Sequence, residues 1–597
     1  MKRLSSAAGF NGSALNNTCV FAPQGKIRRC AHSFSRARSA LVVALALAGA
    51  AAGCHRGKTA RSGPNGADGG ASAAESKRVA ELLSPPPPPL PPLLPAPEQL
   101  PASGHGVQGG TLKINLDTEP SHLDPLMDAD AAALAVVAGL VYEPLLECPS
   151  PGVPGPFRPV LAESWQVSAD GMRIALKLRG GVKWHDGLAF TVVDAQATLE
   201  PLLMARSPAS AVLKAQLQDV ASVEISADNT VRLLLKRPSQ APLWALCDVP
   251  MLPDHVLRGP KPVAATLARQ PVGTGPFRFA GWERGKRIRL ERTTGYWGRA
   301  SPLDGITFEI DTDGAQALTR TRRGDIDVLP RILPVHYPDQ VDAASLHDQL
   351  AVWRMASDRW AYLGVNHRHA PLGDARFRQA LSAMWDRAHF SRTLHGGLAQ
   401  PIAAFPPGGT LPLPSGRVVA AEALEAAGYR DTDADGVREL GGKAIRVGLL
   451  VVGGGRTAAA EARAFVLEAR KVGVLIDTIT VDAATLMNRV HKGDFDLALM
   501  AWQGSPNEDP GLQFGTGAPY NYWGYRSAEL DAALEALRHA DVTSRPARLE
   551  TVSQLLAREQ PVIFLYRFDV AALISKRVHD LAAVADHVDL RRTWVDP

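Results

Sequence analysis

The sequence predicts a mixed α/β protein that folds into more than one lobe. Short runs of alternating or continuous apolar residues, bounded by turn residues, indicate strands. Longer runs with apolar residues at helical spacing indicate helices between those strands. The chain has 597 residues and an ordinary share of apolar and charged side chains for a soluble globular protein, which is enough for two or three domains.

The expected elements follow one another from Gly109 onward. Alternation over Leu112–Leu116 predicts a first strand, and the apolar run 131–141 predicts a buried helix. The segments 165–179 and 223–236 alternate on both sides of the turn signals Asp170-Gly171 and Asp228-Asn229, so each predicts a hairpin. Helices are expected over 374–386, 456–472 and 527–537, with short strands over 445–451 and 496–500.

The start of the chain has the layout of an exported lipoprotein. An apolar run from Ala40 to Gly53, too short for a permanent membrane helix, ends at Cys54. The lipid-attachment pattern usually begins with Leu, where this chain has Ala51. We expect residues 1–53 to be a signal peptide, Cys54 to carry the lipid, and the protein to be periplasmic, in the cell envelope, and anchored to a membrane.

The basic charge of the chain belongs mostly to this leader. Subtracting its seven cations from the formal net charge of +5 leaves about −2 for the rest. We therefore expect no nucleic-acid partner. The cations before Cys54, which no Asp or Glu accompanies, are Lys2, Arg3, Lys26, Arg28, Arg29, Arg36 and Arg38.

A spacer is expected over 54–108. Its first half is rich in Gly, Ala and Ser, and its second half contains five consecutive prolines at 85–89. Such a segment buries too little surface to fold and favours extended polyproline. As a flexible coil, its roughly 54 residues would reach about 40 Å.

Two cysteines remain after the leader and the lipidated residue, namely Cys148 and Cys247. In an oxidising compartment they could form a disulfide, and two buried free thiols are an equal alternative. Sequence alone does not show whether their Cα atoms come within bridging distance.

Several segments, in this order and spacing, resemble the family 5 extracellular solute-binding proteins, the periplasmic dipeptide- and oligopeptide-binding components of ABC importers. The resemblance covers about 490 residues. Its segments are Leu123-Asp124-Pro125, 139–146, 181–187 with Phe190-Thr191 and Asp194, 273–277, 324–327, Asn366, Asp374 to Arg387, Phe495-Asp496, Trp502 and Asp509-Pro510.

The resemblance implies a two-lobed periplasmic-binding-protein fold with an extra domain inserted in the first lobe. Ligand would lie between the lobes, which close on it by a population shift. By the family layout, lobe I would comprise 109–145, 271–360 and 546–597, the extra domain 146–270, and lobe II 361–545.

The segment after Trp502 is the main candidate for ligand binding. In relatives that bind peptides, the acid three residues after this tryptophan pairs with the peptide's α-ammonium group, and a carboxylate inside a closed cleft suits that role. Here that position is Ser505, so Asn507, Glu508 or Asp509 is left to supply the contact. Trp502 itself would form an apolar wall or be a core tryptophan.

Three tyrosines are further cleft candidates that could equally be core or loop residues. Tyr142 lies in the first-lobe motif, Tyr362 precedes the Leu363–Asn366 strand, and Tyr520 begins an aromatic and amide-rich stretch that continues with Asn521 and Tyr522.

Adjacent His185 and Asp186 suggest a catalytic pair. Neighbours on a strand point to opposite faces, so we expect a structural turn instead. The chain has no phosphate loop, Gly-x-Ser-x-Gly elbow or zinc-protease helix, and we expect neither an enzyme nor a cofactor.

Two further patterns suggest metals. Asp431–Gly436 matches the first half of a calcium loop, but position 12 falls on Gly442, so an acidic turn is the preferred interpretation. His367 and His369 could place two imidazoles on one face, although no third ligand follows at a recognisable spacing. We expect no metal site.

The leading hypothesis is a monomeric, membrane-tethered binding protein that delivers a peptide or similar small polar ligand to an ABC permease and its ATPases. A second is the same fold holding a non-peptide ligand such as a metal chelate, haem or sugar. A third is a receptor or interaction protein that keeps the fold without transport.

Overall fold

The computed structural model describes residues 90–95, 100, 107–127, 130–149, 156–258, 267–341, 348–405, 411–504, 509–584 and 587–596. The expected signal peptide, Cys54, Ser505, Asn507 and Glu508 lie outside these residues. Among the described residues, no helix combines the length and the apolar character needed to cross a bilayer.

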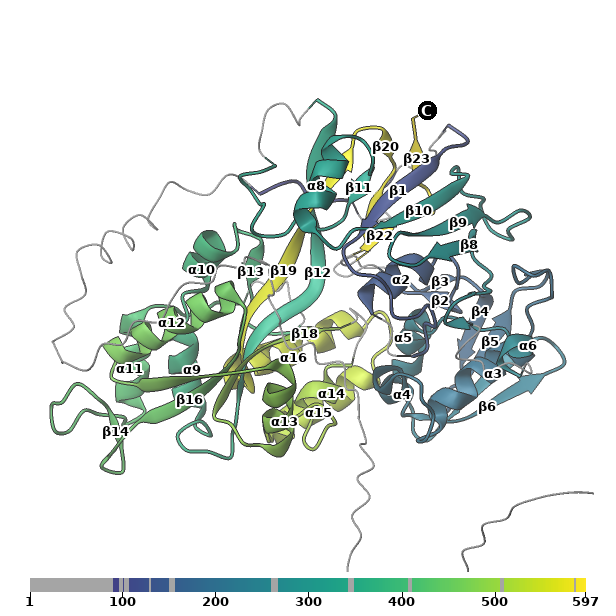
Figure 1. Cartoon of the computed structure of the whole chain (residues 1–597). Helices are drawn as coiled ribbons and strands as arrows, with labels where there is room; N and C mark the ends of the chain where they lie inside the picture. The colour runs from purple at the N-terminus through teal and green to yellow at the C-terminus, as the bar shows by residue number, and fades with distance from the viewer. Residues whose placement is uncertain are drawn as a thin grey trace, which may run out of the picture. The chain divides into compact units, whose positions relative to one another are not determined.

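Two long neighbouring strands pass from one lobe into the other (Figure 1). They are β12 (Leu350–Val365) and β19 (Val562–Ser575), which pair antiparallel along most of their length. Their register shifts between Ala356 and Trp360 and again after Ala361. Because both strands run through both lobes, this irregular stretch is where the lobes are joined.

The first lobe is built on one half of the large mixed sheet, in the order β19-β11-β1-β10-β9-β8. Helices α2 and α8 belong to it, and short C-terminal pairs β20–β23 and β21–β22 complete it. Its elements are β1 (Thr111–Leu116), α2 (Ala131–Val137), β8 (Phe277–Glu283), β9 (Arg287–Arg292), β10 (Gly305–Ile310), α8 (Gly314–Arg322), β11 (Val328–Leu329), β20 (Val578–His579), β21 (Ala582–Val584), β22 (His587–Asp589) and β23 (Trp594–Val595).

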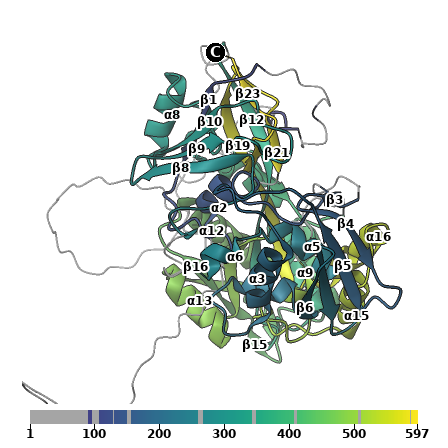
Figure 2. The same ribbon diagram turned by 90° about the vertical axis from the view of Figure 1, so that its right-hand side faces the viewer.

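A separate four-stranded antiparallel sheet, ordered β4-β5-β7-β6, lies between α2 and β8 in the sequence. Helix α3 packs against β6 and β7 of this sheet (Figure 2). We call residues 156–258 the small-sheet region. Together with the short strand β2 before it, it contains β2 (Leu146–Glu147), β3 (Arg158–Pro159), β4 (Ala162–Val167), β5 (Arg173–Leu178), α3 (Val192–Leu203), α4 (Ala211–Gln216), β6 (Val220–Ser226), β7 (Thr230–Leu235), α5 (Ala241–Asp248) and α6 (Asp254–Leu257).

The second lobe contains the other half of the large sheet, in the order β17-β16-β18-β12-β19. Helices pack on it in two buried clusters, one around Phe465 and Trp385 and the other around Trp360 and Trp502. Its elements are α9 (Ala375–Met384), α10 (Arg387–Leu394), β13 (Ala399–Pro401), α11 (Arg417–Ala426), β14 (Glu439–Leu440), β15 (Lys443–Ala444), β16 (Arg446–Val452), α12 (Arg456–Lys471), β17 (Leu475–Val481), α13 (Ala483–Lys492), β18 (Leu497–Gln503), α14 (Gly511–Phe514), α15 (Ala528–Arg538) and α16 (Arg545–Glu559).

Local sequence explains many of these boundaries. Helix α3 begins with a capping box. The Thr191 hydroxyl accepts from a backbone N–H of the first turn, and the Asp194 carboxylate accepts from the Thr191 N–H. Asp482 caps α13 by accepting from Thr485 N. In the predicted hairpins, Gly171 and Asn229 have positive φ of 68° and 63°, as tight turns between twisted strands require.

Two expectations differ from the structure. The helix expected over 131–141 ends at Val137, because the chain leaves the helical conformation at Ala138 and Gly139 has a φ of +68°. Residues 90–95 fall in the expected spacer, yet Leu94 N–H donates to Arg354 C=O (2.8 Å), so this part is not a free spacer.

The partition into domains remains a prediction, and the packing of one helix bears on it. Val552, Leu555 and Leu556 of α16 lie in the same buried cluster as Trp502 of the second lobe. This packing favours a boundary near 560, rather than the expected 546.

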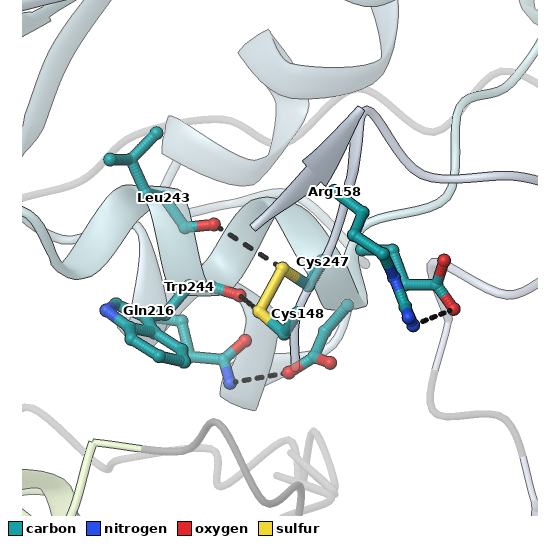
Figure 3. Close-up of a disulfide and its surroundings, with 8 residues drawn as sticks. Cys148, Arg158, Gln216, Leu243, Trp244 and Cys247 are labelled. Carbon is teal, nitrogen blue, oxygen red and sulfur yellow. Dashed lines mark hydrogen bonds and ion pairs between the residues drawn. A yellow bond between two sulfur atoms is a disulfide. The ribbon is translucent and has the colours of Figure 1, made fainter. Parts of the chain in front are cut away.

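A disulfide links Cys148 to Cys247, with Cα atoms 5.7 Å apart (Figure 3). The bond joins the segment after β2 to α5, across 99 positions of sequence. Of the two alternatives that the sequence left open, the structure therefore has the bonded pair.

Candidate ligand-binding site

Three of the four described aromatic candidates lie in one buried cluster of the second lobe. Trp502 on β18 is directly opposite Trp360 on β12, so their side chains share a face of the sheet. Trp502 contacts Tyr520 edge to face, with ring centroids 5.1 Å apart, and Trp360 lies 4.8 Å from Tyr362. All four side chains are at most 5 % exposed, so in this conformation they pack against one another.

Tyr142 belongs to a different core. It is fully buried in the first lobe, and burial raises the pKa of its phenol well above the ordinary value. The structure therefore does not bring Tyr142 together with the Trp502 cluster.

Beside Tyr142, the carboxylate of Glu143 is 4 % exposed and accepts three hydrogen bonds. The donors are Thr274 Oγ1 (2.8 Å), Tyr296 OH (2.5 Å) and Trp297 Nε1 (2.9 Å). Burial raises the pKa of Glu143, and these bonds offset part of that rise. The sequence analysis did not predict this network. The only signals for it were the motifs 139–146 and 273–277, which contain Glu143 and Thr274.

Two glycines let the loop around Thr274 lie directly on the backbone after α2. A Cβ on Gly273 would be 1.7 Å from the carbonyl oxygen of Val141, and one on Gly275 would be 2.3 Å from that of Leu140. No side chain fits at either position without moving the backbone. The motif 273–277 therefore fixes the segment that carries Tyr142 and Glu143.

His185 and Asp186 have separate partners, as expected for a structural turn. The two ring nitrogens of His185 bind the loop of Gly273, because Nδ1 accepts from Gly273 N–H (3.2 Å) and Nε2 lies 2.9 Å from Gly275 C=O. Asp186 instead pairs with His255 at 2.6 Å. Burial lowers the pKa of His185, which suits a neutral imidazole that donates from Nε2.

The only acidic candidate among the described residues after Trp502 is Asp509, and it is held by an arginine. Its Oδ2 accepts from Arg538 Nη2 (2.7 Å) and Nε (3.1 Å), while its Oδ1 accepts from Gly511 N–H (2.8 Å). Both side chains are at most 15 % exposed. Asp509 thus lies two residues before α14, with its carboxylate already bonded on both oxygens.

Arg538 also reaches across to the small-sheet region, where Asp219 Oδ2 lies 3.8 Å from its Nε. Asp219 accepts from Arg237 Nε (2.8 Å), and Arg237 Nη1 in turn donates to Glu535 (3.0 Å). We call these five residues the interlobe cluster. Burial lowers the pKa of Arg538, but the carboxylates of Asp509, Asp219 and Glu535 more than offset this and raise it.

A cation–π contact lies next to the interlobe cluster. The guanidinium carbon of Arg545 lies 4.3 Å from the ring centroid of Trp244, and burial lowers the pKa of Arg545 to about 10. The cavity between them is only about 10 Å³, room for about one water. The small-sheet region and the second lobe are therefore in close contact.

The acidic turn at 431–439 brings four carboxylates within 4.8 Å of one another. Each accepts a hydrogen bond from a backbone N–H of the turn itself; three of the four residues are exposed and Glu439 is half-buried. The interpretation as an acidic turn remains a prediction. The carboxylates belong to Asp431, Asp433, Asp435 and Glu439.

The side chains of His367 and His369 have different partners. His367 Nε2 lies 2.9 Å from Pro561 C=O, and burial together with the charge of Arg378 lowers its pKa to about 4. His369 Nδ1 lies 2.8 Å from Asp496, on the exposed side. The two imidazoles therefore serve different contacts and do not form a shared ligand pair.

The family model described as bacterial extracellular solute-binding proteins, family 5 Middle, matches residues 156–522. The oligopeptide-binding protein AppA of Bacillus subtilis is 27 % identical over 491 residues, which cover 78 % of this chain and 87 % of that protein.

Solved structures share the fold. That of Bacillus subtilis AppA in complex with a nonapeptide has a TM-score of 0.64 at 23 % identity, covering 82 % of this chain and all of that one. That of NikA from Brucella suis in complex with Fe(III)-EDTA has a TM-score of 0.69 at 21 % identity, with the same coverage.

Proposed function

Because this chain belongs to the bacterial extracellular solute-binding proteins of family 5, we propose that it is the substrate-binding component of an ABC importer. It captures a peptide or a similar small polar ligand between its lobes and delivers it to a membrane permease driven by ATPase subunits. Its fold is the two-lobed α/β fold of periplasmic binding proteins.

The observation that carries the proposal is the family match over most of the folded chain, and the joining of the lobes supports it. Only β12 and β19 cross between the sheet halves in the described residues, and their pairing is irregular at the crossing. Such a crossing can bend, and a ligand that contacts both lobes would favour the closed state.

The proposed site lies between the lobes, beside Trp502 of the second lobe. Trp502, Tyr362 and Tyr520 would supply apolar contact from the second lobe, whereas Tyr142 is fully buried in the first-lobe core and is not part of the proposed site. Glu508 is the proposed partner of a ligand ammonium group, since Asp509 already bonds to Arg538. Ser505 and Asn507 would offer neutral polar contacts. The protein acts as a monomer in this proposal.

The cellular location is also part of the proposal. Residues 1–53 would be removed on export, Cys54 would carry the lipid, and the segment after it would tether the folded chain to the membrane. The disulfide between Cys148 and Cys247 is consistent with an oxidising compartment.

The test is native mass spectrometry of the mature chain, purified from its own envelope fraction. A heterogeneous set of bound peptide masses supports the proposal. Calorimetry then measures the affinity for short peptides with a free or an N-acetylated amino terminus. If none of these peptides binds, the peptide assignment is wrong.

A non-peptide ligand is the second candidate. Ser505 stands where peptide-binding relatives have an acid, and Brucella suis NikA holds Fe(III)-EDTA on the same fold. A single non-peptide mass in the same experiment would favour this candidate. An empty protein that takes up no small molecule would favour a receptor instead.

A further inference from the structure

In the part of the chain that the structure describes, no named strand covers one edge of the interlobe strand β12 over its first half. Strand β19 pairs with the other edge, and β18 covers the first edge only from Arg359 to Val365. The N–H and C=O groups that face this edge before Arg359 therefore need other partners.

Residues 90–95 supply such partners at Arg354. Arg354 N–H donates to Pro92 C=O and Leu94 N–H donates to Arg354 C=O, both at 2.8 Å, so Leu93 forms a parallel bridge to Arg354. Three of the six residues are prolines, which lack an N–H and so suit an outer strand. The segment thus adds a short edge strand to β12.

The same segment contacts the chain on both sides of β12. At one end, a Leu90 methyl lies so close to Gly397, in the loop between α10 and β13, that a Cβ there would be 3.0 Å from it. At the other end, Pro95 C=O accepts from Ala583 N–H of β21 at 2.9 Å. Leu94 between them is 8 % exposed and belongs to the first-lobe core.

The position of the bridge matters because of what lies next to it. Arg354 is two residues before the register shift that begins at Ala356, and its Nη1 donates to Asp569 of β19 at 2.7 Å. The side chain of Asp569 is fully buried, and it also pairs with Arg567. The segment is therefore bonded to the strand immediately beside the point where the lobes are joined.

We propose that Leu90–Pro95 is a strap that docks on the open edge of β12 and restrains bending of the two interlobe strands. It holds the loop after α10, the crossing strand and the C-terminal β21 together. Release of the strap would free that edge and broaden the range of lobe separations. The proposal concerns the protein without ligand, so it does not depend on which solute is bound.

The test compares Leu94→Asp with Leu93→Asp in the full mature chain. These neighbours differ in burial, since Leu94 is 8 % exposed and Leu93 is 48 % exposed. Hydrogen exchange of the Arg354 amide should be at least about tenfold faster in Leu94→Asp and unchanged in Leu93→Asp. Equal protection in the wild type and Leu94→Asp would overturn docking.

A second measurement tests the restraint itself. Spin labels replace Val335 and Val418, which are 70 % and 69 % exposed and lie in the first and second lobes, in a chain with Cys54→Ser. The distance distribution should broaden in Leu94→Asp and, to a smaller extent, in Leu94→Ala. Distributions identical to that of the wild type, despite a deprotected Arg354 amide, would overturn the restraint.

Discussion

Arg538 binds Asp509 through Nη2 and Nε, and Asp219 of the small-sheet region lies 3.8 Å from that Nε. One cation thus connects the segment that follows Trp502 with a region that precedes it by nearly 300 positions. A displacement of Asp509 on ligand binding would act directly on the contact between the small-sheet region and the second lobe.

Replacing Arg538 with Leu should lower the free energy of unfolding by about 3 kcal/mol, because it leaves the buried carboxylate of Asp509 without its cation. Asp219 keeps its ion pair with Arg237. Ligand affinity should fall as well, since contact between the regions is weakened. Urea denaturation and calorimetry measure the two effects.

The matched control for Arg538 is Arg278→Leu. Arg278 pairs with Glu291 on the surface, where both side chains are 53 % exposed, and such a pair contributes less than about 1 kcal/mol. Equal losses of stability in the two variants would show that the interlobe cluster has no special role.

Glu508→Gln should weaken binding of a peptide with a free amino terminus by roughly tenfold or more, the worth of one charge-assisted hydrogen bond. Affinity for the N-acetylated peptide should not change, and neither should stability. Asp509→Asn should instead lower stability, because Arg538 loses the closest of its three anionic neighbours. Unchanged affinity when Glu508 and Asp509 are both neutralised would rule out an ammonium site here.

The fold was predictable where the information is local. Turn residues such as Asp170-Gly171 and the apolar alternation around them defined the hairpins, and motif order defined the family. Which aromatic side chains line the cleft was harder to predict from the sequence. Trp502, Tyr362 and Tyr520 were predicted to be cleft residues, and in this conformation the structure packs them in one buried cluster.

Long-range polar partners could not be derived from the sequence. Glu143 and Thr274 are 131 positions apart, and Asp509 and Arg538 are 29 apart, so no periodicity connects them. Docking of residues 90–95 was missed for a different reason. Composition predicts that a Pro-rich segment cannot form its own core, but it does not exclude binding to a strand edge that the rest of the chain leaves open.

Acid should destabilise the protein through His367. Its pKa is about 4 in the folded chain and 6.5 when unfolded, so the unfolded chain binds the proton more readily. The stabilisation is complete above pH 6.5 and declines by up to about 3 kcal/mol as the pH falls to 4. Unfolding free energies of the wild type and His367→Gln across this range measure it.

The neighbouring His369 provides the control for this pH dependence. Its side chain is 43 % exposed and faces Asp496. The acid-dependent loss should persist in His369→Gln and shrink in His367→Gln. If both variants keep the full pH dependence, another group is responsible, and His185, whose pKa burial also lowers, is the next to replace.

Removal of the disulfide should lower stability by about 2–5 kcal/mol, because the bond closes a long loop in the unfolded chain. The double variant Cys148→Ser, Cys247→Ser should unfold at the same urea concentration with and without reductant. The wild type should shift to that concentration only when reduced. A wild type that is insensitive to a reductant that cleaves the bond would contradict the prediction.

Gly273→Ala should disrupt the first lobe, and Gly180→Ala should not. A Cβ at Gly273 would lie 1.7 Å from the Val141 carbonyl oxygen, whereas one at Gly180 would have no atom within 4 Å. The backbone after α2 must then move, which separates Glu143 from its three donors and exposes a buried carboxylate, at a cost of about 3 kcal/mol or more. Tryptophan fluorescence should follow this separation, since Trp297 is one of those donors. If both variants unfold like the wild type, the close approach of Gly273 to Val141 does not determine the position of the segment that carries Tyr142 and Glu143.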